Sequence, residues 1–173
     1  MPATTFEDLA LPLFDQLYNF AHWLTHDTSE AEDLVQETYA KALRGFSGFQ
    51  LGTNFRAWMF RILRNSFLSS RTGLKSMVAL ADDAEETIAS VEPTPEASVI
   101  ARSNRESVRQ ALQELSVPFR EILLLCEVEE MSYEEISQTL MIPIGTVMSR
   151  LSRARKALRA QLSATFRGGP CGL

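Results

Sequence analysis

The chain has 173 residues, of which 45% are hydrophobic, and a formal net charge of −5. This length allows one domain or two small ones, and no apolar run approaches the roughly 20 residues that cross a bilayer. We expect no signal peptide, because Met1–Thr5 lacks a basic stretch followed by an apolar one. Two cysteines, Cys126 and Cys171, are too few for a disulfide framework or a zinc module. These features favour a cytoplasmic globular protein, and the net charge by itself argues against nucleic-acid binding.

The charges are distributed unevenly, so the net charge hides their pattern. Residues 1–37 have a net charge of −8, residues 38–81 of +7, residues 82–98 of −6, residues 99–135 of −4 and residues 136–173 of +6. Four of these five blocks contain charges of one sign only. A charge run is usually a solvated helix face. The alternative is two separate cationic surfaces, each next to an acidic segment, and these would be candidates for contact with nucleic acid.

The hydrophobic pattern predicts an all-α fold, because alternating β-branched residues are almost absent. We expect a first helix over Phe6–Thr25. A second helix begins at a capping box formed by Ser29 and Glu32. It ends before a glycine-rich loop at residues 45–54.

The third expected helix, which Asn54 can cap, has the clearest amphipathic pattern. Its apolar stripe consists of Phe55, Trp58, Met59, Ile62, Leu63 and Phe67. Its opposite arc consists of Arg56, Arg61, Arg64, Asn65 and Arg71. Basic tracks beside aromatic side chains suit single-stranded nucleic acid, and a pocket beside a flexible loop could hold an extruded base. The alternative is that the aromatic residues form core, which is favoured for Phe55, Trp58 and Phe67 and left open for Phe46, Phe49 and Asn65.

An acidic linker is expected between two helical domains, because residues 76–98 carry six acids and two prolines with weak periodicity. The expected organisation is an N-terminal domain at residues 1–75, this linker, a C-terminal domain at residues 99–165 and a tail at residues 166–173. The apolar stripe of the first C-terminal helix consists of Val108, Leu112 and Leu115. Pro118 suits the first turn of the helix that follows.

Residues 132–159 have the pattern of a helix-turn-helix. Ser132 and Glu135 form a capping box for a short helix, and Pro143 interrupts the chain after it. Thr146 is expected to cap a second helix, whose inward stripe consists of Val147, Leu151, Ala154 and Leu158. Its outward face consists of Ser149, Ser152, Arg153 and Lys156, with Arg150 and Arg155 on the flanks. Such a helix enters the major groove, where Arg reads guanine and Ser contacts a base edge or a phosphate. The alternative is an ordinary αα-hairpin with a basic solvated face.

Three motifs, in this order, resemble the extracytoplasmic-function (ECF) subfamily of bacterial RNA polymerase sigma-70 factors. Residues 32–37 are similar to region 2.2 of that family, residues 55–65 to its regions 2.3 and 2.4, and residues 132–155 to its region 4.2. The resemblance implies two small helical domains, a region 2 bundle and a region 4 helix-turn-helix. It also implies a subunit that binds core RNA polymerase and directs promoter-specific initiation, with no catalysis, cofactor or metal of its own.

The resemblance assigns roles to individual residues. The polymerase-binding residues, which would dock on the β′ clamp helices, are Asp33, Gln36, Glu37 and Lys41. The −10 residues, which would melt promoter DNA and capture an unpaired base, are Phe49, Asn54, Arg56, Arg61, Arg64, Asn65, Ser69 and Arg71. The −35 residues, which would read duplex DNA, are Thr146, Ser149, Arg150, Ser152, Arg153 and Lys156. Further implied partners are the polymerase β flap and an anti-sigma factor that blocks both domains.

Some features depart from the family pattern or allow another interpretation. Met148 stands where many members have Lys or Arg, so the −35 preference is expected to differ from that of relatives. His22 and His26 have the spacing of a metal pair, but no nearby Cys or carboxylate pair completes a set. No nucleophile–base pair supports an enzyme. Two other functions fit parts of the pattern: a stand-alone transcription regulator with a helical sensory domain, and a helical adaptor that binds acidic partners.

Overall fold

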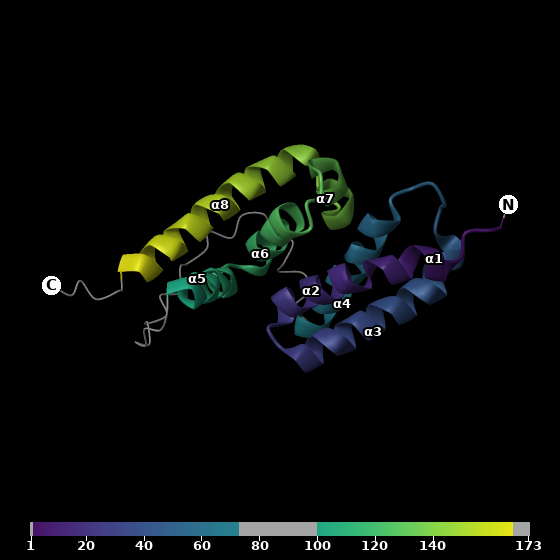
Figure 1. Cartoon of the computed structure of the whole chain (residues 1–173). Coiled ribbons are helices and arrows are strands. Elements are labelled where there is room, and N and C mark those ends of the chain that lie inside the picture. The colour runs from purple at the N-terminus through teal and green to yellow at the C-terminus, as the bar shows by residue number, and fades with distance from the viewer. Residues whose placement is uncertain (1, 73–99, 168–173) are drawn as a thin grey trace.

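The computed structural model describes residues 2–72 and 100–167, and every regular element in these ranges is helical (Figure 1). Helices α1–α4 form an N-terminal unit and helices α5–α8 form a C-terminal unit. The two units are in contact, because α7 packs against α4 and α6 against α2. The expected all-α fold is therefore confirmed. The expected linker at residues 76–98 and residues 168–173 of the expected tail lie outside the described residues.

The N-terminal unit differs from the expected pattern at two helix starts. Its helices are α1 (Phe6–Ala10), α2 (Phe14–Thr25), α3 (Thr28–Gly45) and α4 (Phe55–Thr72). The expectation of one helix over Phe6–Thr25 is wrong, because a 3₁₀ turn around Pro12 separates α1 from α2. The expected capping box at Ser29 is also wrong. Asp27 caps α3 instead, and its carboxylate accepts a hydrogen bond from the Glu30 N–H at 2.9 Å.

Helix α4 is held by its cap and by an apolar face that is mostly buried. The Ala57 N–H donates to Asn54 Oδ1 at 3.0 Å, which confirms Asn54 as the cap. Met59, Phe60 and Leu63 are completely buried. Phe60 lies outside the expected stripe, yet its ring packs on Phe20 of α2 with the centroids 5.2 Å apart. More of the surface of α4 is therefore buried than the expected stripe indicates, because neighbouring residues beside the stripe also pack into the core.

The aromatic residues of the glycine-rich loop belong to a cluster at one end of this core. Phe46 and Phe49 stack 6.2 Å apart, and Phe49 lies 4.9 Å from the Trp58 ring. Phe55 contacts both Phe49 and Trp58. Phe46, Phe49 and Trp58 remain half-buried. The open question about Phe46 and Phe49 therefore has an intermediate answer: they pack together and keep one accessible side.

The C-terminal unit contains the expected helix-turn-helix. Its elements are α5 (Ile100–Glu114), α6 (Val117–Leu123), a π-helical turn (Leu124–Val128), α7 (Tyr133–Leu140) and α8 (Ile144–Arg167). Pro118 lies in the first turn of α6, and Ser132 and Glu135 form both hydrogen bonds of a capping box, as expected. Thr146 does not cap α8. The helix begins at Ile144, so Thr146 lies inside its first turn, and the Val147 N–H donates to Pro143 O at 3.0 Å.

The apolar packing of this unit follows the expected stripe on α8 but not on α5. Val147, Leu151 and Ala154 of α8 are at most 1% exposed. Val108 of α5 is 39% exposed, so its place in the expected stripe is wrong, and Ala111 is buried instead. Helix α7 ends at Met141, whose backbone lies in the left-handed region at φ 57°. A non-glycine residue there adds strain that the packing of the helix-turn-helix offsets.

Arg120 of α6 is a buried arginine, 8% exposed, whose partners are all backbone carbonyls. It donates to Leu112 O at 2.9 Å, Gln113 O at 2.9 Å and Leu115 O at 3.1 Å, which are acceptors at and just after the end of α5. It also donates across the units to Leu24 O at 3.2 Å. These bonds satisfy carbonyls that the end of a helix leaves without partners. Arg120 therefore fixes α6 to α5 and to α2.

We expect Arg120→Met to lower the free energy of unfolding by about 3 kcal/mol, because it leaves several buried carbonyls without donors while the stem volume is kept. Urea unfolding followed by circular dichroism measures this change. The control is Arg159→Met, since Arg159 is exposed and donates only to Arg155 O within α8. Equal, small effects of the two substitutions would contradict a structural role for Arg120.

Candidate nucleic-acid interface

The first part of the cationic arc of α4 faces the C-terminal unit. Three of its arginines, Arg56, Arg61 and Arg64, donate hydrogen bonds to acceptors on the C-terminal unit. Asn54, at the start of the helix, does the same. The sequence correctly places these side chains on one face, but it gives no sign that the second half of the chain covers that face.

Arg64 forms the most buried of these contacts. Its Nε lies 2.7 Å from Glu121 Oε2, and the two side chains are 12% and 1% exposed. Burial raises the pKa of Glu121, while the positive charges of Arg64 and of Arg150 on α8 oppose that rise. Glu121 Oε1 has no hydrogen-bond partner. Removing this pair of charges from water costs free energy, and their single hydrogen bond offsets only part of that cost.

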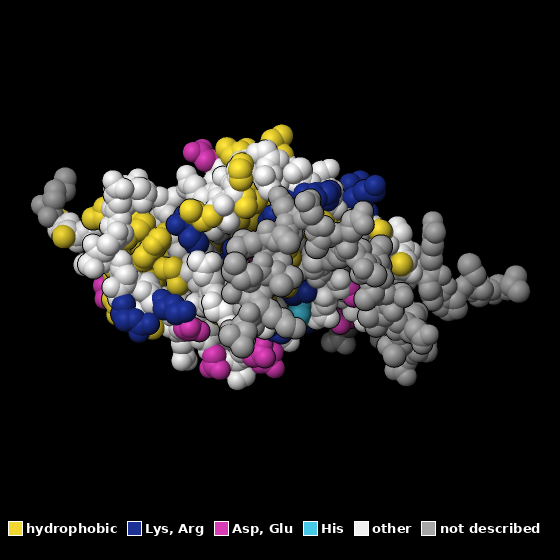
Figure 2. Space-filling view, turned by 180° about the vertical axis from the view of Figure 1, so that it is seen from behind, with side chains coloured by type: hydrophobic (Ala, Val, Ile, Leu, Met, Phe, Trp, Pro, Cys, Tyr) yellow, Lys and Arg dark blue, Asp and Glu magenta, His cyan; other side chains and the backbone are white. Residues whose placement is uncertain are grey.

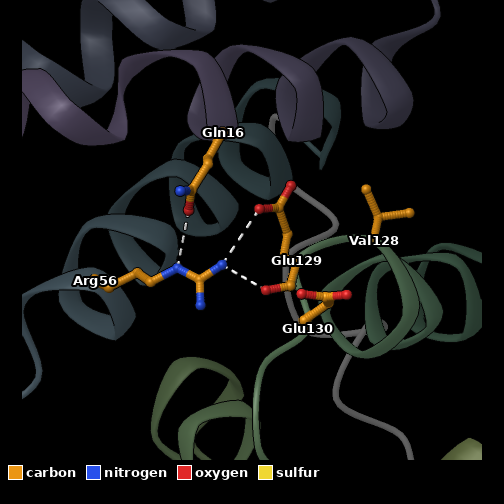
Figure 3. Close-up of a pocket in the computed structure, with 5 residues that line it drawn as sticks. All are labelled: Gln16, Arg56, Val128, Glu129 and Glu130. Atoms are coloured by element: carbon orange, nitrogen blue, oxygen red, sulfur yellow. Dashed lines mark hydrogen bonds and ion pairs between the residues drawn. The ribbon is translucent and has the colours of Figure 1, made fainter.

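Arg56 joins three elements (Figure 3). Its Nη2 donates to Glu129 O at 2.6 Å and approaches Glu129 Oε2 at 3.4 Å, and its Nε donates to Gln16 Oε1 on α2 at 3.0 Å. Glu129 follows the π-helical turn, where the helical bonding ends and its carbonyl is left for another donor. Burial raises the pKa of Glu129, and the nearby Arg56 opposes this rise.

A pocket of about 540 Å³ lies where the glycine-rich loop meets α4 and α7. Its walls come from the loop and α4, and its lining residues are Gly48, Phe49, Gln50, Gly52, Thr53, Asn54, Trp58, Arg61 and Gln138. Arg61 donates to Gln138 O from Nη2 at 2.7 Å, and Asn54 Nδ2 donates to Glu135 Oε1 at 3.2 Å. The pKa of Glu135 is lowered, chiefly by the Ser132 N–H that donates to it. Aromatic and cationic groups thus share one hollow with residues of α7.

The remaining −10 residues lie outside this contact. Asn65 and Ser69 are exposed on α4. Arg71 pairs with Glu30 of α3 at 3.1 Å, and its guanidinium lies 5.2 Å from the Phe67 ring centroid. The structure therefore divides the eight residues into a covered group near the C-terminal unit and an exposed group along α4.

The polymerase-binding residues lie together on an exposed face of α3. Asp33, Gln36 and Glu37 are exposed. Lys41 pairs with Glu37 at 2.7 Å and donates to Ser66 Oγ of α4 at 3.0 Å. The acidic face is thus open to a partner and is connected to α4 through one lysine.

The −35 residues occupy the first half of α8. Ser149, Ser152, Arg153 and Lys156 are exposed, as the expected outward face requires. Thr146 and Arg150 are half-buried, and Arg150 is close enough to Glu121 to influence its pKa. Seen from behind, Lys and Arg side chains lie in separate groups rather than in one continuous strip (Figure 2). Four of the six −35 residues are therefore exposed on α8.

Comparison with known proteins identifies the family. The models for Sigma-70 region 2 and Sigma-70 region 4 match residues 12–76 and 105–158. The ECF RNA polymerase sigma factor EcfG of Rhodopseudomonas palustris is 36% identical over 163 residues, 94% of this chain and 88% of that protein. The chain belongs to the ECF subfamily of sigma-70 factors. The expected family, its two-domain helical fold and its role as a promoter-directing sigma factor are thereby confirmed.

Two further relatives give the same result. The ECF RNA polymerase sigma factor SigE of Mycolicibacterium smegmatis is 36% identical over 161 residues, and the match spans 92% of this chain but 62% of that protein. A solved structure of the sigma factor RpoE with the anti-sigma factor NepR, from Bartonella quintana, is similar with a TM-score of 0.70 and 33% identity. It covers 91% of this chain and 96% of the RpoE chain. No helix in the described part of the sigma factor is long and apolar enough to cross a membrane.

The sequence does not directly indicate the acceptors that bind the −10 arginines. Glu121 and Glu129 lie in a segment that its composition marks only as acidic. One signal was available for Glu121, because it directly precedes the apolar run Ile122–Leu125, which is buried. A carboxylate next to such a run needs a cation when the helix packs.

We expect the difference in free energy of unfolding between the wild-type protein and Glu121→Gln to depend on pH. A raised pKa means that folded Glu121 keeps its proton at a pH where the unfolded residue, with an ordinary value of 4.5, has lost it. Ionisation therefore costs stability in the fold, and wild-type protein should lose stability relative to the Gln variant as the pH rises above about 4.5. Free energies of unfolding of both proteins across this range measure the difference. A difference that stays constant or moves the other way would contradict the assignment, and Glu127→Gln, at an exposed position, is the matched control.

Proposed function

We propose that this sigma factor binds core RNA polymerase through α3, opens the −10 element with α4 and the glycine-rich loop, and reads the −35 element with α8. The observation that supports this most directly is that α4 lies inside the matched Sigma-70 region 2, and the first part of α8, up to residue 158, lies inside the matched Sigma-70 region 4. In domain terms, residues 1–75 would serve polymerase and the −10 element, and residues 99–165 the −35 element.

The proposed polymerase contact is supported by the two faces of α3. Ala31, Leu34 and Val35 are buried against the N-terminal unit, while Asp33 and Glu37 point away from it. The two acids are spaced i, i+4, so they lie one above the other on the helix surface. An exposed acidic face on a firmly packed helix suits a rigid basic partner, and the β′ clamp helices are the partner that the family implies.

The proposed −10 contact is supported by the pocket at the loop. An unpaired base can stack on the accessible side of Phe49 or Trp58, while Arg61 and Asn54 offer donors at the rim. Arg56 and Arg64 continue the cationic track along α4 and would pair with backbone phosphates. Asn65 and Ser69 extend it on the exposed side of the helix.

The proposed −35 contact is supported by the exposed residues at the start of α8. Arg153 and Lys156 are exposed, and Ser149 lies one turn before Arg153 on the same face. Met148 is 55% exposed beside them, and an apolar side chain there favours contact with a thymine methyl group over a phosphate. The half-buried Arg150 contributes from the flank.

We propose an anti-sigma factor as the regulatory partner and the cytoplasm as the site of action, where polymerase and promoter DNA meet. Support for the regulatory partner comes from RpoE of Bartonella quintana, which has been solved with the anti-sigma factor NepR and which matches this chain over nearly its whole length. The same two surfaces that we assign to DNA would then be available to an inhibitor.

Run-off transcription from a promoter library, with core polymerase alone and with this chain added, tests the proposed function. We expect specific transcripts only when the chain is present. The double variant Asp33→Lys, Glu37→Lys should abolish both these transcripts and capture by core polymerase, because it reverses the acidic face of α3 without touching the core. The control is Glu7→Lys, Asp15→Lys, which makes the same charge change at exposed positions of α1 and α2.

Two results would contradict the proposal in different ways. Tight duplex binding without polymerase, and no transcript with it, would favour a stand-alone regulator. If core polymerase captured the Asp33→Lys, Glu37→Lys variant as well as the wild-type protein, the proposed docking on α3 would be wrong.

The −35 assignment predicts a sequence-dependent effect at Arg153. We expect Arg153→Ala to cost about 1–3 kcal/mol on the preferred −35 sequence and to relax the preference at one base pair. Binding of the polymerase holoenzyme to matched and mismatched −35 duplexes measures it. Arg159→Ala, two turns nearer the end of α8, is the control. A uniform loss on all sequences would instead make Arg153 a phosphate contact.

A further inference from the structure

We propose that α8 reads the −35 element through thymine methyl groups at two positions, by an apolar row that consists of Ile144 and Met148. The row gives Ile144 a role in specificity and sets a spacing between these thymines and the guanine that Arg153 reads. The inference deepens the proposed function and rests on it, because the row reaches base edges only when α8 lies in the major groove.

Ile144 and Met148 form a row that the fold leaves open. They are 46% and 55% exposed, and their i, i+4 spacing places them one above the other on the helix surface. The inward face of α8 is formed by other residues, since Val147 and Leu151 are at most 1% exposed. The row is therefore not part of the core. In the major groove, the apolar group that base pairs present is the C5-methyl of thymine, so this group is the occupant that fits the row.

The charges next to the row do not direct it to a phosphate. Arg155 lies on the same flank of α8, two turns after Met148. Its guanidinium is bound to the Glu127 carboxylate, with N–O distances of 2.8 and 3.1 Å. Glu127 is 56% exposed, so it adds a negative charge that repels phosphate on this side. This flank therefore favours a neutral, apolar contact.

Small residues lie beside the row, where α8 would face the floor of the groove. Gly145, Ser149 and Ser152 are exposed. A Cβ added to Gly145 would meet no other element of the protein within 4 Å, so packing inside the protein does not explain this glycine. Ser149 donates its hydroxyl to Thr146 O at 3.2 Å, which leaves its oxygen as an acceptor for a base. Short side chains here let the helix approach closely enough for Met148 to reach a methyl group.

The spacing along α8 predicts where the thymines lie. A helix rises about 1.5 Å per residue, and successive base pairs are about 3.4 Å apart. Met148 lies about 7.5 Å before Arg153 along the axis, which is roughly two base-pair steps, and Ile144 lies about two steps further. With the axis of α8 along the groove, we expect one thymine roughly two steps from the guanine that Arg153 reads, and another roughly two steps beyond it.

Deoxyuridine tests this contact, because it differs from thymidine only by the missing C5-methyl group. The binding of the polymerase holoenzyme formed with this chain is measured on its preferred promoter, with each −35 thymine replaced in turn. We expect the affinity to fall roughly three- to fivefold at each thymine under the row, which is the effect of about one buried methyl group. The other thymines should tolerate the replacement.

Variants of α8 connect each methyl group to one side chain. Met148→Gln keeps the length and removes the apolar end, so the effect of deoxyuridine should disappear at the thymine nearer the guanine and persist at the other. Ile144→Thr should do the reverse. Met148→Arg should also lose the methyl effect and make binding more dependent on salt, because a cation there pairs with phosphate. The matched control is Met141→Gln, which should keep both effects, since Met141 is 69% exposed but ends α7 outside the row.

Two results would overturn the proposal. One is a −35 element in which no thymine responds to deoxyuridine, and the row would then be left to a protein partner. The other is a methyl effect that survives in both Met148→Gln and Ile144→Thr, because it would come from the shape of the DNA.

Arg153→Ala on the same promoter separates this failure from failure of the proposed function. If it relaxes the base preference while deoxyuridine has no effect, α8 reads the −35 element without the apolar row. If the wild-type holoenzyme binds preferred and scrambled −35 elements alike, the proposed function itself is wrong.

Discussion

An arginine that leaves water must keep acceptors for its donors, and this requirement determines how the two units of the protein meet. Helix α4 presents Arg56, Arg61 and Arg64 on one side, and the C-terminal unit offers oxygens where its own helical bonding ends or where a carboxylate is buried. The Glu129 carbonyl follows a π-helical turn, the Gln138 carbonyl lies near the end of α7, and Glu121 lies at the base of an apolar run. These polar bonds add to an apolar contact, because the buried apolar residues of the two units belong to one continuous cluster.

The buried Arg120 meets the same requirement at a site that is closed to solvent and to other ligands. Its four acceptors are carbonyls, three of them from one short stretch around the end of α5, and the side chain is almost fully enclosed. A phosphate has no access to such a site. Arg64 differs because its partner is a carboxylate whose burial is itself unfavourable, so a phosphate can replace it at lower cost. The chemistry of the acceptor thus separates the structural Arg120 from the arginine that we propose for DNA contact.

The sequence predicted most of the fold because the signals involved are local. The cap at Asn54, the capping box at Ser132 and the buried face of α8 depend on residues a few positions apart, and all are present. The errors have local causes as well: Pro12 interrupts a helix, and Asp27 outcompetes Ser29 as a cap. The contact of α4 with α6 and α7 could not be predicted, since its residue pairs lie 57 to 81 positions apart. Charge spacing along one segment carries no information about which distant segment will pair with it.

The pattern of charge blocks acquires its meaning from that pairing. The basic block at residues 38–81 and the acidic block at residues 99–135 meet in space, so part of the cationic character of α4 is neutralised inside the molecule. In the basic block at residues 136–173, Arg155 pairs with Glu127, while Arg153 and Lys156 are exposed and extend their electrostatic field into solvent. A field of this kind accelerates encounter with DNA over distances set by the ionic strength. The acidic segment of the C-terminal unit therefore offsets part of the positive charge of α4, while the cations on the outer face of α8 stay accessible.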